Sequence, residues 1–294
     1  MQGGIISPTL ANMTLDGIQP ILAQRYKRIC RKGKHYSPMV NLVRYADDFI
    51  ITSAEKEVLE REIKPMLVEF LAERGLELSE EKTVITHIDD GFDFLGFNIR
   101  KFKGVLLTQP SKKCVKKFLD GIRYTIDSNK SCKQETLIRL LNPKITGWAN
   151  YYRCGASSKT FQRVDDQIFR KLWQWAKRRH PKKGKPWSLK KYFQHYKNRN
   201  WRFLVVLNKN GKEDIFPLKL AFETKIMRHK KIVSEANPFD RKWREYFEER
   251  MTYKMLMSLK GRKSLLYMWN KQERKCPICG QEITAETQWN VREK

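Results

Sequence analysis

The sequence predicts an α+β protein in which a mixed first part is followed by a mainly helical, basic part. In residues 1–100, short apolar runs of strand type alternate with helical patterns and turn residues. From residue 112 onward, helical periodicity dominates. The charge divides the chain at nearly the same place, because residues 1–100 carry 13 basic and 15 acidic side chains and residues 101–294 carry 47 and 17.

The overall composition narrows the class of protein. A length of 294 residues suggests about two domains at roughly 100–200 residues each. The net charge of +28 indicates a polyanionic partner, most often nucleic acid. No apolar run approaches the ~20 residues of a membrane-spanning helix and no signal peptide opens the chain, so we expect neither a membrane protein nor a secreted one. Six unevenly spaced cysteines fit a reducing compartment.

The first predicted elements surround a pair of adjacent acids. Residues 5–30 have a helical pattern. Two apolar runs then flank Asp47-Asp48, which predicts a β-hairpin over residues 42–53 with the acids at its tip.

A helix and two strands are expected to follow. The helix carries apolar residues at intervals of three and four, is kinked by Pro65 and is capped at Gly75. Strands are expected over residues 84–88 and 92–99, because both stretches are rich in β-branched or aromatic residues.

The second part begins with a basic helix after Pro110-Ser111, and a second helical block covers residues 136–179. We interpret the aromatic residues of this block as core packing. They are Trp148, Tyr151, Tyr152, Phe169 and Trp173.

The rest of the second part alternates between basic tracts and short elements. The tract 177–191 is dense in Lys and Arg and is broken by Pro and Gly, so we predict a linker that also meets phosphate. A strand over residues 201–207 ends in a turn at 208–211, and residues 218–262 are predicted to be helical and basic.

The acids at the hairpin tip are the sharpest chemical signal. Two neighbouring carboxylates repel each other, and a divalent cation relieves that cost. Two carboxylates on a tight turn can hold Mg²⁺, and two metal ions ~4 Å apart can activate a 3′-hydroxyl and stabilise a leaving pyrophosphate. The alternative is an ordinary turn, in which Asp is common.

Five motifs, in the family's order, resemble those of reverse transcriptases encoded by group II introns. They are QGGIISPTLAN at 2–12, VRYADDF at 43–49, GLELSEEKT at 75–83, FDFLGF at 92–97 and LNPKITGWANYY at 141–152. The last motif is similar to the maturase-specific thumb signature, which retron and diversity-generating reverse transcriptases lack. Together the motifs span nearly the whole chain.

The resemblance implies a polymerase palm with named site residues. Asp47 and Asp48 would be the Mg²⁺ ligands of a two-metal site, and Lys82 would lie near the triphosphate and help protonate the leaving group. The residues implied to lie beside template or nucleotide are Gln2, Gly3, Gly4 and Tyr45. Those implied to brace the primer end are Leu95, Gly96 and Phe97.

The resemblance also implies a basic thumb that binds intron RNA through phosphate contacts. The residues expected to do so are Lys112, Lys113, Arg153, Arg163, Arg170, Lys177, Arg178, Arg179, Lys182 and Lys183. The implied domains are the C-terminal half of the palm (1–110), the thumb or maturase domain (111–215), a basic DNA-binding region (216–264) and a truncated HNH endonuclease remnant (265–294).

Departures from the family pattern limit the expected activities. The third palm carboxylate and the fingers, which the family places upstream of residue 2, are not in this sequence, so we expect no polymerisation by the chain alone. Cys276 and Cys279 form half of a zinc knuckle, and four-coordinate zinc needs a second pair, so zinc binding is not expected. Arg292 follows Trp289-Asn290-Val291 where the HNH pattern has histidine, so we expect no nuclease activity.

Three functions stay open on the sequence alone. The chain could be a reverse transcriptase fragment that is active with its missing N-terminal half as a separate chain, a non-catalytic maturase-type chaperone of intron RNA, or a decayed product. Expected partners are group II intron RNA and a DNA target, with no membrane. The expected location is the bacterial cytoplasm, in association with the nucleoid, or an organelle. We also expect a protease-resistant thumb and labile first hundred residues, because the palm sheet would keep an open edge.

Overall fold

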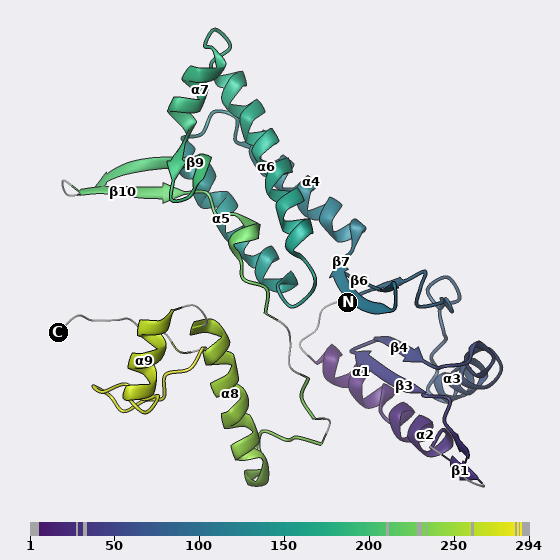
Figure 1. Cartoon of the computed structure of the whole chain (residues 1–294). Helices are drawn as coiled ribbons and strands as arrows, with labels where there is room; N and C mark the ends of the chain where they lie inside the picture. The colour runs from purple at the N-terminus through teal and green to yellow at the C-terminus, as the bar shows by residue number, and fades with distance from the viewer. Residues whose placement is uncertain are drawn as a thin grey trace. The chain divides into compact units, whose positions relative to one another are not determined.

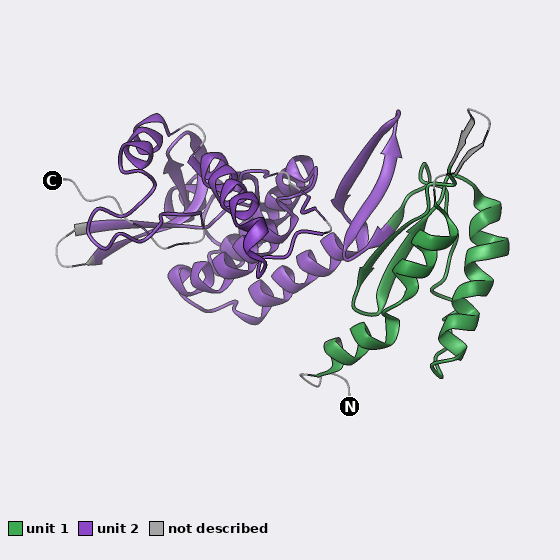
Figure 2. Cartoon of the chain, turned by 90° about the horizontal axis from the view of Figure 1, so that it is seen from below, with its two compact units in different colours: residues 1–92 green, residues 93–294 purple. Residues whose placement is uncertain are grey.

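The computed structural model describes residues 6–27, 29–31, 34–209, 212–227, 231–233, 235–259, 262–285, 287 and 289. Gln2, Gly3 and Gly4 lie outside these ranges. The chain forms two compact units, residues 1–92 and 93–294, which Figure 2 colours separately. Both contain helices and small antiparallel sheets, so the predicted α+β class is confirmed. The domain boundaries expected at 110, 215 and 264 stay predictions. None of the helices in the described ranges is both long and apolar enough to span a bilayer.

The first unit places a β-hairpin on a small helical core (Figure 1). Its elements are α1 (Ser7–Leu15), α2 (Ile18–Arg25), β1 (Ile29–Arg31), β2 (Lys34–Tyr36), β3 (Asn41–Tyr45), β4 (Asp48–Thr52), the π-helical turn η1 (Val58–Ile63) and α3 (Lys64–Ala72). Helices α1, α2 and α3 and the turn η1 supply the buried apolar side chains. They are Leu15, Ile18, Leu22, Val58, Ile63, Leu67, Phe70 and Leu71.

Glycine and proline divide the helices of this unit. The stretch expected to be helical over 5–30 is split, because Gly17 adopts a left-handed φ of +105° between α1 and α2. The kink expected at Pro65 takes the form of the widened turn η1 directly before it, which removes the clash between the proline ring and the preceding turn. Gly75 caps α3 as expected, with φ +66°, and Leu76 N–H donates to the Leu71 carbonyl at 2.9 Å.

The strand predicted over residues 84–88 is wrong. This stretch is irregular, and Val84 is exposed. A strand needs a partner for its backbone groups, and no described segment pairs with it.

The second unit begins with a three-stranded sheet in the order β5-β6-β7. The strands are β5 (Phe92–Phe94, which starts at the unit boundary), β6 (Phe97–Phe102) and β7 (Val105–Pro110). The strand expected over 92–99 is thus two strands joined by a tight turn, in which Leu95 and Gly96 have φ of +48° and +78°.

Three long helices form the main core of the second unit. They are α4 (Lys112–Ser128), α5 (Gln134–Tyr152) and α6 (Ser158–Arg179), and α4 packs on both of the others. The Ser111 hydroxyl accepts from Cys114 N–H at 3.2 Å and caps α4, as the sequence predicts. Every fully buried Ile or Leu here stabilises the fold by about 1.5–3 kcal/mol. The largest are Ile122, Ile126, Leu137, Ile138, Leu141, Ile145, Ile168 and Leu172.

A short helix and a second sheet complete this body. They are α7 (Lys185–Tyr192), β8 (Phe193–Tyr196), β9 (Arg199–Lys209) and β10 (Lys212–Pro217), with sheet order β10-β9-β8. The prediction that 177–191 is a linker holds only for residues 180–184, because 177–179 end α6 and 185–191 belong to α7. Pro186 stands at the start of α7, where a proline is tolerated. The predicted strand over 201–207 lies inside β9 and is confirmed.

The helix predicted over 218–262 exists only in its last part. After the short turn η2 (Ala221–Glu223), the described residues before η3 (Arg241–Trp243) are irregular. In the described part of this stretch only α8 (Arg244–Leu259) is a full helix. With α9 (Lys263–Lys271) it forms a small core of Met255, Leu259 and Trp269.

Candidate functional site

The adjacent acids lie at the tip of the hairpin in the first unit. Tyr45 pairs with Asp48, which leaves Ala46 and Asp47 as a two-residue turn, and Ala46 has a φ of +53°. Both aspartates are exposed, and nothing in the described part of the chain bonds to either carboxylate. Their oxygens are therefore available to a ligand.

The two faces of the hairpin differ in what covers them. Leu42, Phe49 and Ile51 pack against the core of the first unit. On the opposite face, Val43 and Tyr45 are 56% and 65% exposed, and Asp48 shares this face with Tyr45 because the two are cross-strand partners. Tyr45 and Asp48 thus share the open face, and Asp47 lies beside them in the turn. Their roles at template, nucleotide and metal stay predictions.

One contact inside the unit holds the hairpin in place. Arg44 donates to the backbone carbonyl of Asn12 at 3.2 Å, which ties β3 to α1. Lys82 is exposed on a turn in which its N–H donates to the Ser79 carbonyl at 3.2 Å, and it makes no polar contact with Asp47 or Asp48 among the described groups. Its role at the triphosphate stays a prediction.

The turn at Leu95-Gly96-Phe97 is fixed by helix α5. The Tyr151 hydroxyl donates to the Leu95 carbonyl at 2.8 Å. The Phe97 ring lies 5.5 Å from the ring of Tyr151 and 4.9 Å from that of Tyr152. The two tyrosines that end the maturase-like motif therefore position the turn expected to brace a primer.

Close packing around this turn requires glycine. A Cβ at Gly96 would lie 2.8 Å from the Tyr152 hydroxyl and 3.2 Å from Cys114 Sγ. Burial raises the pKa of Tyr152, so this hydroxyl stays protonated. Trp148 extends the aromatic cluster, with its ring 4.5 Å from Phe118, so the core-packing interpretation is supported for Trp148 and Tyr152. It is wrong for Tyr151, which is 54% exposed.

Several cations expected to bind RNA are exposed on the helices. Lys112 and Lys113 occupy the first turn of α4, where the helix dipole disfavours positive charge. Arg163, Lys177, Lys182 and Lys183 are exposed as well. Because the helix dipole disfavours lysine at this position, an anionic partner would explain why two lysines stand there.

Other members of the expected set have structural partners. Arg179 donates to the carbonyls of Lys130 and Cys132, at 3.1 and 2.5 Å, and so ties the end of α6 to the α4–α5 loop. Arg153 contacts the sulfur of Met227, and Arg170 pairs with Asp166 at 3.0 Å. Arg178 lies 3.8 Å from Asp127.

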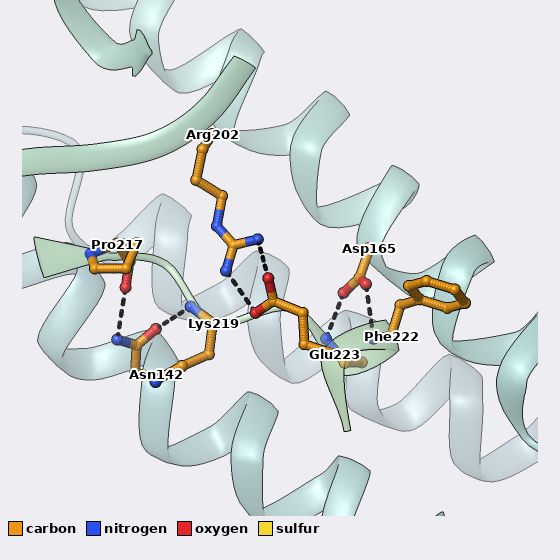
Figure 3. A network of polar contacts seen from close by, with 8 residues as sticks. Asn142, Asp165, Arg202, Pro217, Lys219, Phe222 and Glu223 are labelled. Carbon is orange, nitrogen blue, oxygen red and sulfur yellow. Dashed lines mark hydrogen bonds and ion pairs between the residues drawn. The ribbon is translucent and has the colours of Figure 1, made fainter. Parts of the chain in front are cut away.

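A polar clamp that the sequence did not reveal holds residues 217–223 against helix α5 (Figure 3). Asn142 donates to the Pro217 carbonyl at 3.1 Å and accepts from Lys219 N–H at 2.7 Å. Arg202 on β9 forms two 2.7 Å bonds to the carboxylate of Glu223.

Helix α6 completes the clamp through Asp165. Its carboxylate accepts from the N–H groups of Ala221 and Phe222, at 2.8 and 3.0 Å, as Figure 3 shows. Burial raises the pKa of Asp165 to about 6, although both N–H bonds and the nearby Arg199 and Arg202 act in the opposite direction. In the sequence, the signal that could have revealed the clamp is an acid, Asp165, among the apolar positions of a helix.

The cysteine pair forms a preorganised turn. The N–H groups of Cys279 and Ile278 point at Cys276 and lower the pKa of its thiol. Among the described residues, no cluster of three or more His, Cys, Asp or Glu side chains could hold a metal ion. The absence of zinc therefore stays a prediction.

Cys276 should be alkylated faster than Cys154 at neutral pH, because a lowered pKa increases the thiolate fraction of Cys276. Iodoacetamide labelling of the reduced protein over time, followed by peptide mass spectrometry, measures both rates in one sample. Cys154 is exposed and serves as the internal control. Equal rates would show that the turn does not activate the thiol.

Comparison with known proteins finds a matching family model for each of two segments of the chain. Residues 1–99 match the family model "Reverse transcriptase (RNA-dependent DNA polymerase)" and residues 115–193 match "Group II intron, maturase-specific domain". The chain belongs to the group II intron reverse transcriptase/maturase family.

Three relatives illustrate how much of a longer protein is covered. Protein YkfC of Escherichia coli is 32% identical over 33% of this chain and 31% of its own length. Group II intron-encoded protein LtrA of Lactococcus lactis is 39% identical over 28% of this chain and 14% of its own. The ribosomal operon-associated A protein of Euglena gracilis is 26% identical over 50% and 29%. The chain thus spans less than a third of each relative.

Proposed function

We propose that the chain supplies two of the carboxylates of a reverse transcriptase site and binds intron RNA through its basic helices. The observation that carries the first part is the exposed Asp47-Asp48 pair, whose oxygens no described group occupies, in a segment that matches the reverse transcriptase model. The same match favours catalysis over a function in RNA binding alone.

The chemistry of the donor set fits Mg²⁺. Magnesium prefers oxygen ligands and is bound by one or two carboxylates while it keeps several waters. Asp47 and Asp48 would hold it, and when bound it would neutralise charge on the attacking and leaving oxygens of nucleotidyl transfer. Lys82 Nζ is proposed to neutralise the triphosphate and to donate a proton to the leaving pyrophosphate.

We propose that a second polypeptide segment supplies a third carboxylate. Within the described ranges, no third acid joins the pair in a metal-binding cluster. The hairpin β3–β4 also pairs with no other described strand, and the side chains of Val43 and Tyr45 are exposed on its outer face. Unpaired strand edges and exposed apolar faces are places where another segment adds.

Primer extension tests the catalytic part. The purified chain, Mg²⁺ and an RNA template with a DNA primer are combined with and without the fingers and N-terminal palm of a related reverse transcriptase in trans. We expect extension only in the combined reaction, and loss to background with Asp47→Ala or Asp48→Ala. Asp90→Ala, another exposed aspartate of this unit, is the matched control. Extension that survives Asp47→Ala would refute the assignment.

RNA binding tests the second part. Phosphate contacts release counterions, so the logarithm of the affinity for a group II intron RNA should fall steeply with the logarithm of salt concentration, by about 0.7–0.9 per contact. A shallow slope would contradict the proposal. Binding of a DNA target through 216–264 rests on the resemblance and is likewise a prediction.

A further inference from the structure

At the tip formed by the end of α6 and the start of α7, aromatic rings form a chain of edge-to-face and tilted contacts. Trp187, in the first turn of α7, packs its ring 4.6 Å from His180. His180 Nε2 lies 2.7 Å from the Tyr192 hydroxyl. Tyr192 is buried against Trp175, 5.5 Å between rings. This chain of ring contacts therefore runs outward from the core, and Trp187 is its outermost ring.

Trp187 is still 36% exposed, although it is anchored from behind. An exposed indole costs hydrophobic free energy that packing deeper would recover. A rigid aromatic ring with one side in solvent is the form that proteins use to stack an unpaired base.

The charges around this ring are all of one sign. Lys191 Nζ lies 4.8 Å and Lys183 Nζ 5.7 Å from the centre of the Trp187 ring. Residues 177–191 contain eight Lys or Arg and no Asp or Glu. Among the ion pairs of the described residues, one joins this tract to a carboxylate: Asp127 lies 3.8 Å from Arg178. Exposed cation–π contacts are weak, so a base can displace the ammonium groups.

We propose that Trp187 is a stacking platform for an unpaired nucleotide, with Lys183 and Lys191 on the adjoining phosphates. The inference rests on the proposed RNA-binding function and names which part of the RNA this tip recognises. A base inside a duplex is stacked between its neighbours and cannot reach the indole, whereas a base in a loop, bulge or free end can.

A second exposed tryptophan provides the matched control. Trp201 is 59% exposed on the same unit, at a bulge where Asn200 and Trp201 lie opposite His195. Unlike Trp187, it has no Lys or Arg over its ring among the described side chains, and no aromatic partner there.

Fluorescence anisotropy with the full chain tests the proposal. The probes are a short unstructured RNA strand, the same strand in a blunt duplex, and a DNA strand of the same sequence. Trp187→Leu should weaken single-strand RNA binding about tenfold, because the stacking contact between the base and the indole is lost. Its salt slope should not change, because no phosphate contact is lost, and duplex binding should stay as in the unmodified chain.

The other variants separate stacking from charge. Trp187→Phe should keep most of the affinity, and Trp201→Leu should keep all of it. Lys183→Gln and Lys191→Gln should weaken single strand and duplex alike and lower the salt slope by about 0.7–0.9 each. Quenching of 2-aminopurine in the strand, lost in Trp187→Leu, reports stacking directly and does not depend on affinity.

The outcomes also separate this proposal from the one it rests on. If the unmodified chain binds RNA with a steep salt slope and Trp187→Leu binds the single strand equally well, only the stacking site is refuted. It is also refuted if Trp187→Leu weakens both forms equally, or weakens only the DNA strand. If the unmodified chain binds neither these RNA probes nor a group II intron RNA, the RNA-binding part of the proposed function fails together with the stacking site.

Discussion

Replacing Gly155 with alanine should destabilise residues 93–294 by about 2–4 kcal/mol, because the new methyl group has no room. A Cβ at this buried position would lie 2.6 Å from the backbone carbonyl oxygen of Thr108 on β7. The same carbonyl accepts from Ala156 N–H at 2.8 Å. A backbone carbonyl cannot rotate away as a side chain can. Either the hydrogen bond from Ala156 N–H breaks, or the β5–β6–β7 sheet shifts relative to the helices. Thermal unfolding should show a fall of about 5–15 °C in the midpoint.

Gly147→Ala is the matched control for this prediction. Gly147 lies inside α5, and a Cβ there would meet nothing within 4 Å. Alanine should therefore be neutral or stabilise by about 0.5–1 kcal/mol, because it favours the helix over the unfolded chain. Equal midpoints for the two variants would show that β7 is not held against the α5–α6 loop.

Local patterns revealed the hairpin and the long helices because the physics that forms them is local. Asp47 and Asp48 could be placed at a turn from the apolar runs beside them, and Ser111 could be recognised as a helix start. The exposure of the two acids follows from the same pattern, since a turn between paired strands faces solvent.

The contacts that the sequence did not predict join residues far apart in the chain. Asp165 bonds to backbone groups 56 and 57 residues later, and Asn142 to groups 75 and 77 residues later. No window of sequence contains both partners. The strand predicted around Val84 is wrong because strand formation also depends on distant partners. Its composition suits a strand, but no described segment pairs with it.

The stability of the second unit should fall by about 3 kcal/mol as pH rises from about 4 to about 6, through Asp165 alone. Burial of this carboxyl, which is 7% exposed, raises its pKa from 3.8 to about 6. The folded chain then binds the proton more tightly than the unfolded chain, so the contribution to stability is full below pH 3.8 and is lost as pH rises through the folded pKa. Each pKa unit corresponds to about 1.4 kcal/mol.

Asp165→Asn isolates this contribution because the amide does not titrate. The free energy of unfolding of the unmodified chain minus that of the variant, measured in urea from pH 4 to pH 7, should fall across the window and be flat above it. Asp166→Asn is the control, because Asp166 is exposed and its pair with Arg170 belongs to the surface class worth about 0–1 kcal/mol. A difference for Asp165→Asn that rises with pH would mean that the N–H bonds from Ala221 and Phe222 outweigh burial. The clamp would then favour the charged carboxylate.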